Sequence, residues 1–227
     1  MAVAVRRPSV VLWVSWMLAA AIGSAVAAAM VTSMSGLLPN DLVGSAISTA
    51  LRAAPLALLQ YLVLRSTAGF PPRAAGLWVA ASLLAAALFA PVTVTWYEQG
   101  VSRVPVQLMT NGLMDVLMAG DHWVYALLFG FAQGLVLTSV LRRPIVTAVW
   151  VAGNLLAIGV APYVGLVAAP TGLFGGPAAL ANRMLSAVEF WVVFAAITGL
   201  ALVALFRLWG PPTAPAPAAR LLPAPRL

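Results

Sequence analysis

The sequence predicts an all-α integral membrane protein whose six transmembrane helices form three parallel-oriented helical-hairpin repeats with a pseudo-threefold arrangement. Three observations lead to this prediction: the apolar composition, the one-sided distribution of arginines, and a pattern that recurs in each hairpin. Of the 227 residues, 63% are hydrophobic and 7% are charged, whereas soluble domains have about 25% charged residues. A bilayer supplies the apolar surroundings that so many apolar side chains need.

The composition also excludes several kinds of site. The chain has no cysteine, which rules out disulfides, thiolate nucleophiles and thiolate-bound metal clusters. His122 is the only histidine, so one chain cannot hold a metal with several imidazoles. The net charge of +7 is explained by arginines that flank the apolar stretches, and we expect no nucleic-acid partner and no cofactor.

A helix that spans a bilayer needs about 20 mostly apolar residues. Six stretches of the sequence meet this requirement, and together they make a transmembrane domain over residues 9–208. It follows a short N-terminal segment, 1–8, and precedes a Pro/Ala-rich tail, 209–227, which we expect to be disordered in the cytoplasm. The stretches are 9–31, 43–64, 76–96, 122–141, 145–166 and 186–208.

Charged residues divide the ends of these stretches into two sets. Arginines dominate one set, and carboxylates outnumber arginines in the other. The positive-inside rule places the arginine-rich set in the cytoplasm, beside anionic lipid headgroups, and both termini with it. The arginine-rich set comprises Arg6, Arg7, Arg65, Arg73, Arg142, Arg143, Arg207, Arg220 and Arg226, and the other set comprises Asp41, Glu98, Asp115, Asp121, Arg103 and Arg183.

The odd-numbered stretches share a tryptophan-led pattern. WVSWMLAA starts at Trp13, WVAASLLA at Trp78 and WVAGNLLA at Trp150. The first 28 residues also have the basic start, apolar core and small residues of a cleaved secretory signal. The recurrence favours a retained helix instead, because Trp13 opens the first copy of the pattern.

The even-numbered stretches also align with one another, as ALLQYLVL, GFAQGLVL and AAITGLAL. Gln60, Gln133 and Thr198 share one column of this alignment. The chain therefore reads as three hairpins inserted in the same direction, which an axis along the membrane normal would relate. The hairpins are 9–64, 76–141 and 145–208.

This pattern resembles a loose group of small uncharacterised bacterial six-span membrane proteins, over most of residues 9–208. The third copy departs from the pattern, because Thr198 replaces glutamine. The resemblance implies the six-helix architecture and no particular activity. We accordingly expect a multi-pass protein of the bacterial inner membrane.

Five polar residues fall at similar predicted depth in the cytoplasmic half of the bundle. We expect Gln60 to bond Ser82 and Gln133 to bond Asn154, and such bonds are worth about 0.6 kcal/mol on average in membranes. The layer then fixes the register of the hairpins, and the alternative is a polar ring that contacts a solute or a headgroup. The layer comprises Gln60, Ser82, Gln133, Asn154 and Thr198.

Two charged residues, Arg52 and Glu189, lie inside predicted spans at nearly matching depth. An isolated ion in hydrocarbon is costly, whereas an Arg–carboxylate pair is largely neutralised. We therefore expect an intramembrane ion pair, which is either a clamp between the first and third hairpins or a gate or proton-linked site.

Other features have mainly structural interpretations. Glycine and alanine at every fourth position, as at Gly23 and Gly130, predict close helix packing. Residues 97–121 form the outer connection, in which the spacing of apolar residues predicts a short amphipathic surface helix. His122 is interpreted as an interfacial histidine, and the alternative is an axial ligand of a pigment. Interfacial belts are expected from Trp13, Trp78, Trp150 and Trp209 on one side, and from Trp96, Trp123 and Trp191 on the other.

The sequence favours a protein without catalytic activity, because no HExxH, GxSxG or P-loop motif is present. We expect a structural or accessory subunit of a membrane assembly, which contacts lipid and either other membrane proteins or further copies of itself. The alternative is a small-solute or lipid transporter or channel that uses the polar layer and the Arg52–Glu189 pair. A continuous polar cavity beside Gln60 and Gln133 would favour transport, and a filled axis would favour the structural role.

Overall fold

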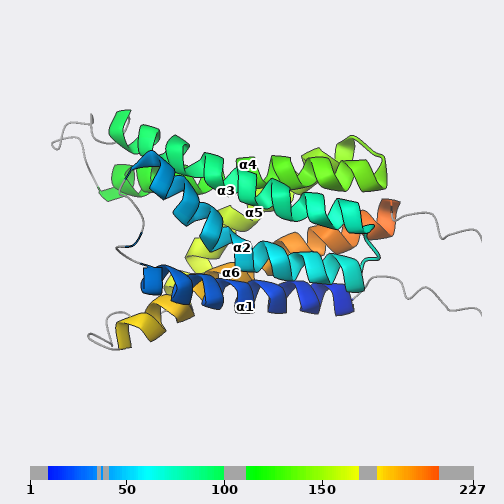
Figure 1. Ribbon diagram of the computed structural model, residues 1–227, viewed down its shortest axis with the longest axis horizontal. Coiled ribbons are helices and arrows are strands. Elements are labelled where there is room, and N and C mark those ends of the chain that lie inside the picture. Colours follow the sequence, from blue (N-terminus) through cyan, green and yellow to red (C-terminus); the bar gives the residue numbers. More distant parts are fainter. Residues whose placement is uncertain (1–9, 35–36, 38–40, 100–110, 169–177, 210–227) are drawn as a thin grey trace, which may run out of the picture.

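The computed structural model describes residues 10–34, 37, 41–99, 111–168 and 178–209, and the regular structure in these ranges is α-helical (Figure 1). Five helices are long and apolar enough to cross a membrane, so the fold is compatible with a membrane protein. In α5 the apolar stretch that the structure describes, Ile145–Ala161, is shorter. The helices are α1 (Val10–Met34), α2 (Leu42–Ser66), α3 (Pro72–Gln99), α4 (Asn111–Leu141), α5 (Ile145–Ala168) and α6 (Ala178–Trp209).

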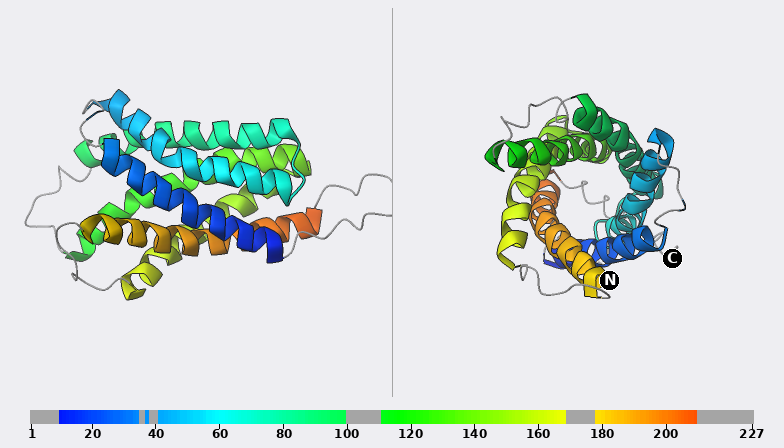
Figure 2. Two further views of the ribbon diagram at one scale, coloured as in Figure 1. Left: turned by 60° about the horizontal axis from the view of Figure 1, so that its bottom comes forward. Right: turned by 90° about the vertical axis from the view of Figure 1, so that its left-hand side faces the viewer.

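The helices form a closed ring. Each packs against its neighbours in the chain, and α6 packs against α1, as the end-on view in Figure 2 shows. Successive helices run in opposite directions, so α1, α3 and α5 begin at the end of the bundle where α2, α4 and α6 finish (Figure 1). We call the opposite end the far end. The end where α1, α3 and α5 begin is called the arginine end, because it carries Arg65, Arg73, Arg142, Arg143 and Arg207.

Local signals set the limits of α2. At the far end the Asp41 carboxylate accepts a hydrogen bond from the Gly44 N–H over 2.7 Å, which caps the helix. At the arginine end Gly69 has a φ of 66°, a conformation that glycine adopts without steric cost. The chain then turns so that the Phe70 N–H bonds to the Leu64 carbonyl over 3.0 Å. This turn brings α3 back alongside α2.

Glycines allow close helix contacts, as their spacing predicts. A Cβ atom on Gly23 of α1 would lie 2.7 Å from the Cα atom of Leu56 in α2. A Cβ atom on Gly134 of α4 would lie 3.0 Å from the Cα atom of Thr147 in α5. Gly76 differs, because nothing lies within 4 Å of the corresponding position. Only some of the glycines are therefore required for packing.

The helices extend further at the far end than the sequence predicts. α3 continues to Gln99 and α4 begins at Asn111. Residues 111–121, which we expected in the outer connection, therefore belong to the first turns of α4. Residues 100–110, the N-terminal segment and the tail beyond Trp209 lie outside the described residues.

Candidate functional site

Three tryptophans meet inside the ring. Trp16 of α1, Trp78 of α3 and Trp150 of α5 are at most 1% exposed, and we call them the tryptophan cluster. Their ring centroids lie 5.7, 6.3 and 5.7 Å apart in edge-to-face pairs, a geometry that aromatic quadrupoles favour. The prediction that Trp78 and Trp150 belong to an interfacial belt was wrong, because their N–H groups find acceptors inside the protein.

Each indole of the tryptophan cluster donates its N–H to a polar side chain on the adjacent helix. The acceptors are the amide oxygens of two glutamines and the hydroxyl of a threonine, so Thr198 performs the role of the glutamines with which it aligns. These bonds join α3 to α2, α5 to α4 and α1 to α6. The nitrogen–oxygen distances are 3.1 Å for Trp78 and Gln60, 3.3 Å for Trp150 and Gln133, and 3.2 Å for Trp16 and Thr198.

All five residues of the predicted polar layer are buried, but their partners differ from the expected ones. Gln133 donates through Nε2 to Ser82 Oγ over 2.9 Å, and Ser82 donates to the carbonyl of Trp78 over 2.8 Å. Asn154 donates through Nδ2 to the carbonyl of Trp150 over 2.8 Å, rather than bonding Gln133. Depth along the helices was predictable, whereas the facing neighbour depends on how the helices rotate against one another.

The axis is nearly filled at this layer. A void of only about 20 Å³ remains there, and Gln60, Gln133 and Asn154 are among the residues that line it. Towards the arginine end, Leu64, Leu137 and Leu202 are 0% exposed. Together with the tryptophan cluster, these side chains close the bundle on its arginine side.

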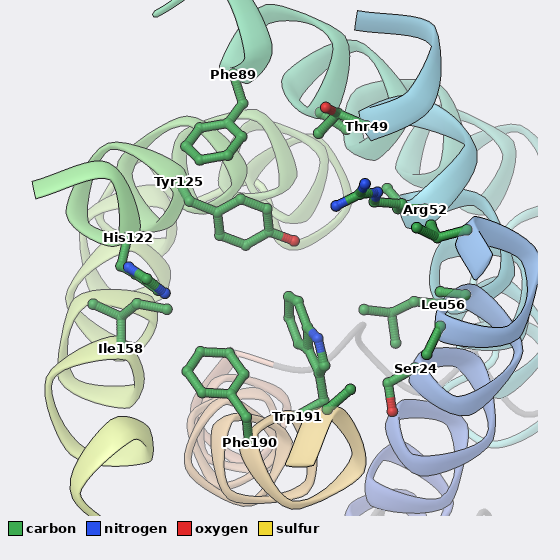
Figure 3. Close-up of a pocket in the computed structure, with 16 residues that line it drawn as sticks. Ser24, Thr49, Arg52, Leu56, Phe89, His122, Tyr125, Ile158, Phe190 and Trp191 are labelled. Carbon is green, nitrogen blue, oxygen red and sulfur yellow. The ribbon is translucent and has the colours of Figure 1, made fainter. Parts of the chain in front are cut away.

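The far-end half of the bundle contains a cavity of about 540 Å³, and all six helices contribute to its lining. Figure 3 shows its two chemically different sides. Arg52 of α2 and Tyr125 of α4 point towards one another near Thr49, whereas Phe190 and Trp191 of α6 present aromatic rings opposite. The cavity is therefore largely apolar with one polar wall.

No ion pair joins Arg52 and Glu189 in this structure. The Arg52 side chain points into the cavity, and Glu189, which is half-buried on α6, is not among the described residues that line it. Within the described part of the chain, no ion pair or hydrogen bond engages the Arg52 guanidinium. Its charge therefore faces the cavity.

His122 also lines the cavity, with its ring centroid 6.1 Å from that of Phe190. Among the described residues there is no cluster of three or more His, Asp or Glu side chains that would suit a metal ion. The histidine is thus part of an aromatic wall together with Phe190 and Trp191.

Sequence reasoning missed two residues of this region, Trp16 and Tyr125. Trp13, which aligns by pattern with Trp78, is only half-buried and donates to the Ala196 carbonyl over 2.8 Å. A shift of three residues brings Trp16 into the column of Trp78, and its burial supports that register. Tyr125 carried no distinguishing signal, because an aromatic residue near the end of a span is expected at the membrane interface.

Comparison of the chain with protein-family models, curated protein sequences and solved structures found no match.

Proposed function

We propose that the protein is a six-span protein of the bacterial inner membrane with both termini in the cytoplasm. The 24 residues of α5 support a sixth span, because about 20 residues suffice to cross the hydrocarbon core. The arginines gathered at one end of the bundle support the orientation, since the positive-inside rule places them in the cytoplasm. The resemblance to bacterial six-span proteins supports the compartment.

The bundle consists, in this proposal, of three repeats about an axis along the membrane normal. The three tryptophan–acceptor bonds support it, because each links an odd-numbered helix to the preceding even-numbered helix, and α1 to α6. Exposure in the even helices supports it too. Leu62, Leu135 and Leu200 are 56%, 50% and 57% exposed, whereas Leu64, Leu137 and Leu202 are 0% exposed.

Within the membrane the protein serves as a non-enzymatic structural or accessory subunit. The filled axis carries this proposal: a void of about 20 Å³ at the polar layer leaves no passage for a solute. The polar layer also consists of amides and hydroxyls, which provide no general base of suitable pKa. Its hydrogen bonds hold the helices in register.

The experiment that tests this role is purification of the tagged protein from its native host in a mild detergent, followed by native mass spectrometry. We expect stoichiometric membrane-protein partners. A shortened chain that ends at Trp209 keeps the helical bundle and removes the proline-rich tail, so it shows whether the partners are held by the tail. Purification of the full chain alone, or only as copies of itself, would contradict the role of subunit in a mixed assembly.

A transporter of a small solute or lipid is the second candidate, and the far-end cavity favours it. A cavity confined to one half of a bundle, beside an axis that is nearly filled, is what one state of an alternating-access cycle would contain. Flux of a labelled amphiphile across proteoliposomes that hold only this protein would support transport. Binding without flux would leave the structural role in the lead.

A further inference from the structure

We propose that the far-end cavity binds a single-chain amphiphile with an anionic head group, whose oxygens accept hydrogen bonds from Arg52 and Tyr125. The inference depends on the proposed insertion into a membrane, but not on the accessory role.

The first step is the charge. Arg52 is the one permanently charged residue among the described residues that line the cavity. It lies eight residues from Gln60, about 12 Å along α2 from the polar layer, and therefore within the candidate span Leu42–Ser66. An arginine at such depth requires an anion or water close by. An anionic head group inside the cavity satisfies this requirement.

The second step is the hydrogen bonding. The guanidinium has only donors, and the Tyr125 hydroxyl also has a proton to donate. Neither group has a hydrogen-bond partner in the described part of the chain, and Figure 3 shows the two side chains converging from α2 and α4. Carboxylate and phosphate oxygens can accept from both at once. A cationic head group would be repelled at the same place.

The third step is the shape and the apolar wall. The volume of about 540 Å³ falls within the range of small-ligand sites. From Ser24 to Val31, both in its lining, the cavity extends along α1 for about 10 Å. Leu56, Phe190 and Trp191 give it a surface that water wets poorly. A single apolar chain fills such a volume better than a two-chain bilayer lipid does.

The fourth step is the closed base. Beyond the cavity, the void at the polar layer shrinks to about 20 Å³, and the tryptophan cluster follows. The apolar chain of a bound amphiphile therefore stays on the far-end side of the polar layer. The cavity is a blind site, in which the head group and the chain are both held on the far side.

The test uses the full-length protein in nanodiscs of zwitterionic lipid, with tritiated dodecanoate as the probe and empty nanodiscs as background. We expect saturable binding that unlabelled dodecanoate displaces. Dodecanol and dodecyltrimethylammonium should each displace it at least about tenfold less well, because each lacks the charge-assisted hydrogen bonds. Inorganic phosphate should displace nothing, since a free anion lacks the apolar chain.

Three variants and one matched control locate the site. Arg52→Gln should weaken binding about tenfold or more, and Tyr125→Phe about threefold to tenfold. Arg207→Gln removes an exposed arginine at the other end of the bundle and is the matched control, with unchanged binding expected. Arg52→Lys retains the charge and should restore part of the affinity. Such a recovery would show that the loss in Arg52→Gln comes from the missing charge and not from a folding defect.

The outcomes separate the two proposals. Extraction of the protein from membranes by alkaline carbonate would overturn the proposed insertion. An inserted protein that binds no dodecanoate, or that binds dodecanoate and dodecanol equally, would overturn only the ligand inference. Unchanged affinity in a folded Arg52→Gln variant would overturn it as well. Displacement of the probe by inorganic phosphate would show a simple anion site in place of an amphiphile site.

Discussion

The indole N–H of Trp78 donates to the Gln60 amide oxygen over 3.1 Å, between two helices that adjoin the same short turn. Trp78 is 0% exposed and Gln60 is 7% exposed, so neither group can exchange this bond for one to bulk water. This bond explains the glutamine within an apolar run. Its amide oxygen accepts the hydrogen bond of a tryptophan that is buried where α2 packs against α3.

This bond predicts coupling between the two residues. Trp78→Phe should destabilise the protein by about 1–3 kcal/mol, because it leaves the amide oxygen of Gln60 without a donor. In the double variant with Gln60→Leu, the loss of unfolding free energy should be smaller than the sum of the two single losses, by about 0.6–1.7 kcal/mol. Thermal unfolding in detergent measures each term. Trp123→Phe is the control, since Trp123 is 43% exposed, and strictly additive losses would refute the coupling.

Thr198 predicts a distinction between two small changes. Thr198→Val removes the oxygen that accepts the Trp16 N–H at 3.2 Å and should lower the free energy of unfolding by about 1–2 kcal/mol. Thr198→Ser keeps the hydroxyl and should cost clearly less. The same unfolding assay compares them, and an equal loss in both variants would show that the methyl group, rather than the hydrogen bond, matters at this site.

The glycines predict a contrast between two alanine substitutions. Gly23→Ala would place a Cβ atom 2.7 Å from the backbone of Leu56, so α1 and α2 must separate, and we expect a loss of about 1–3 kcal/mol. Gly76→Ala meets nothing within 4 Å and should be neutral or slightly stabilising, because alanine favours the helix. Melting temperatures of both variants in detergent decide this. A comparable loss at Gly76 would contradict the packing argument.

Cysteine labelling tests the orientation, since the chain has no cysteine of its own. Leu37 lies at the far end and is 75% exposed, and Ser66 is an exposed residue at the arginine end. In intact spheroplasts a membrane-impermeant maleimide should modify Leu37→Cys and spare Ser66→Cys. Permeabilised cells provide the control, in which both should react. The reverse pattern in intact spheroplasts would invert the proposed topology.

The sequence predicted the helices better than their contacts. The apolar stretches, the arginine end and the burial of the polar layer were all readable, because each depends on position along a single helix. The alignment of α1 with α3 and α5 was wrong by three residues, because Trp16 rather than Trp13 joins the tryptophan cluster. The far-end cavity was not anticipated, because residues from all six helices line it and their arrangement around one volume depends on tertiary packing.

The sequence by itself determined an all-helical, strongly apolar chain with one basic end. Only the tertiary structure decided which side chains face the axis, which polar groups pair, and that Arg52 meets a cavity instead of Glu189. The reason is visible at Leu62 and Leu64, which are 56% and 0% exposed. A leucine on the outer surface and a leucine in the core are equally apolar, so hydropathy cannot separate them, and the rotation of each helix is set by packing against its neighbours.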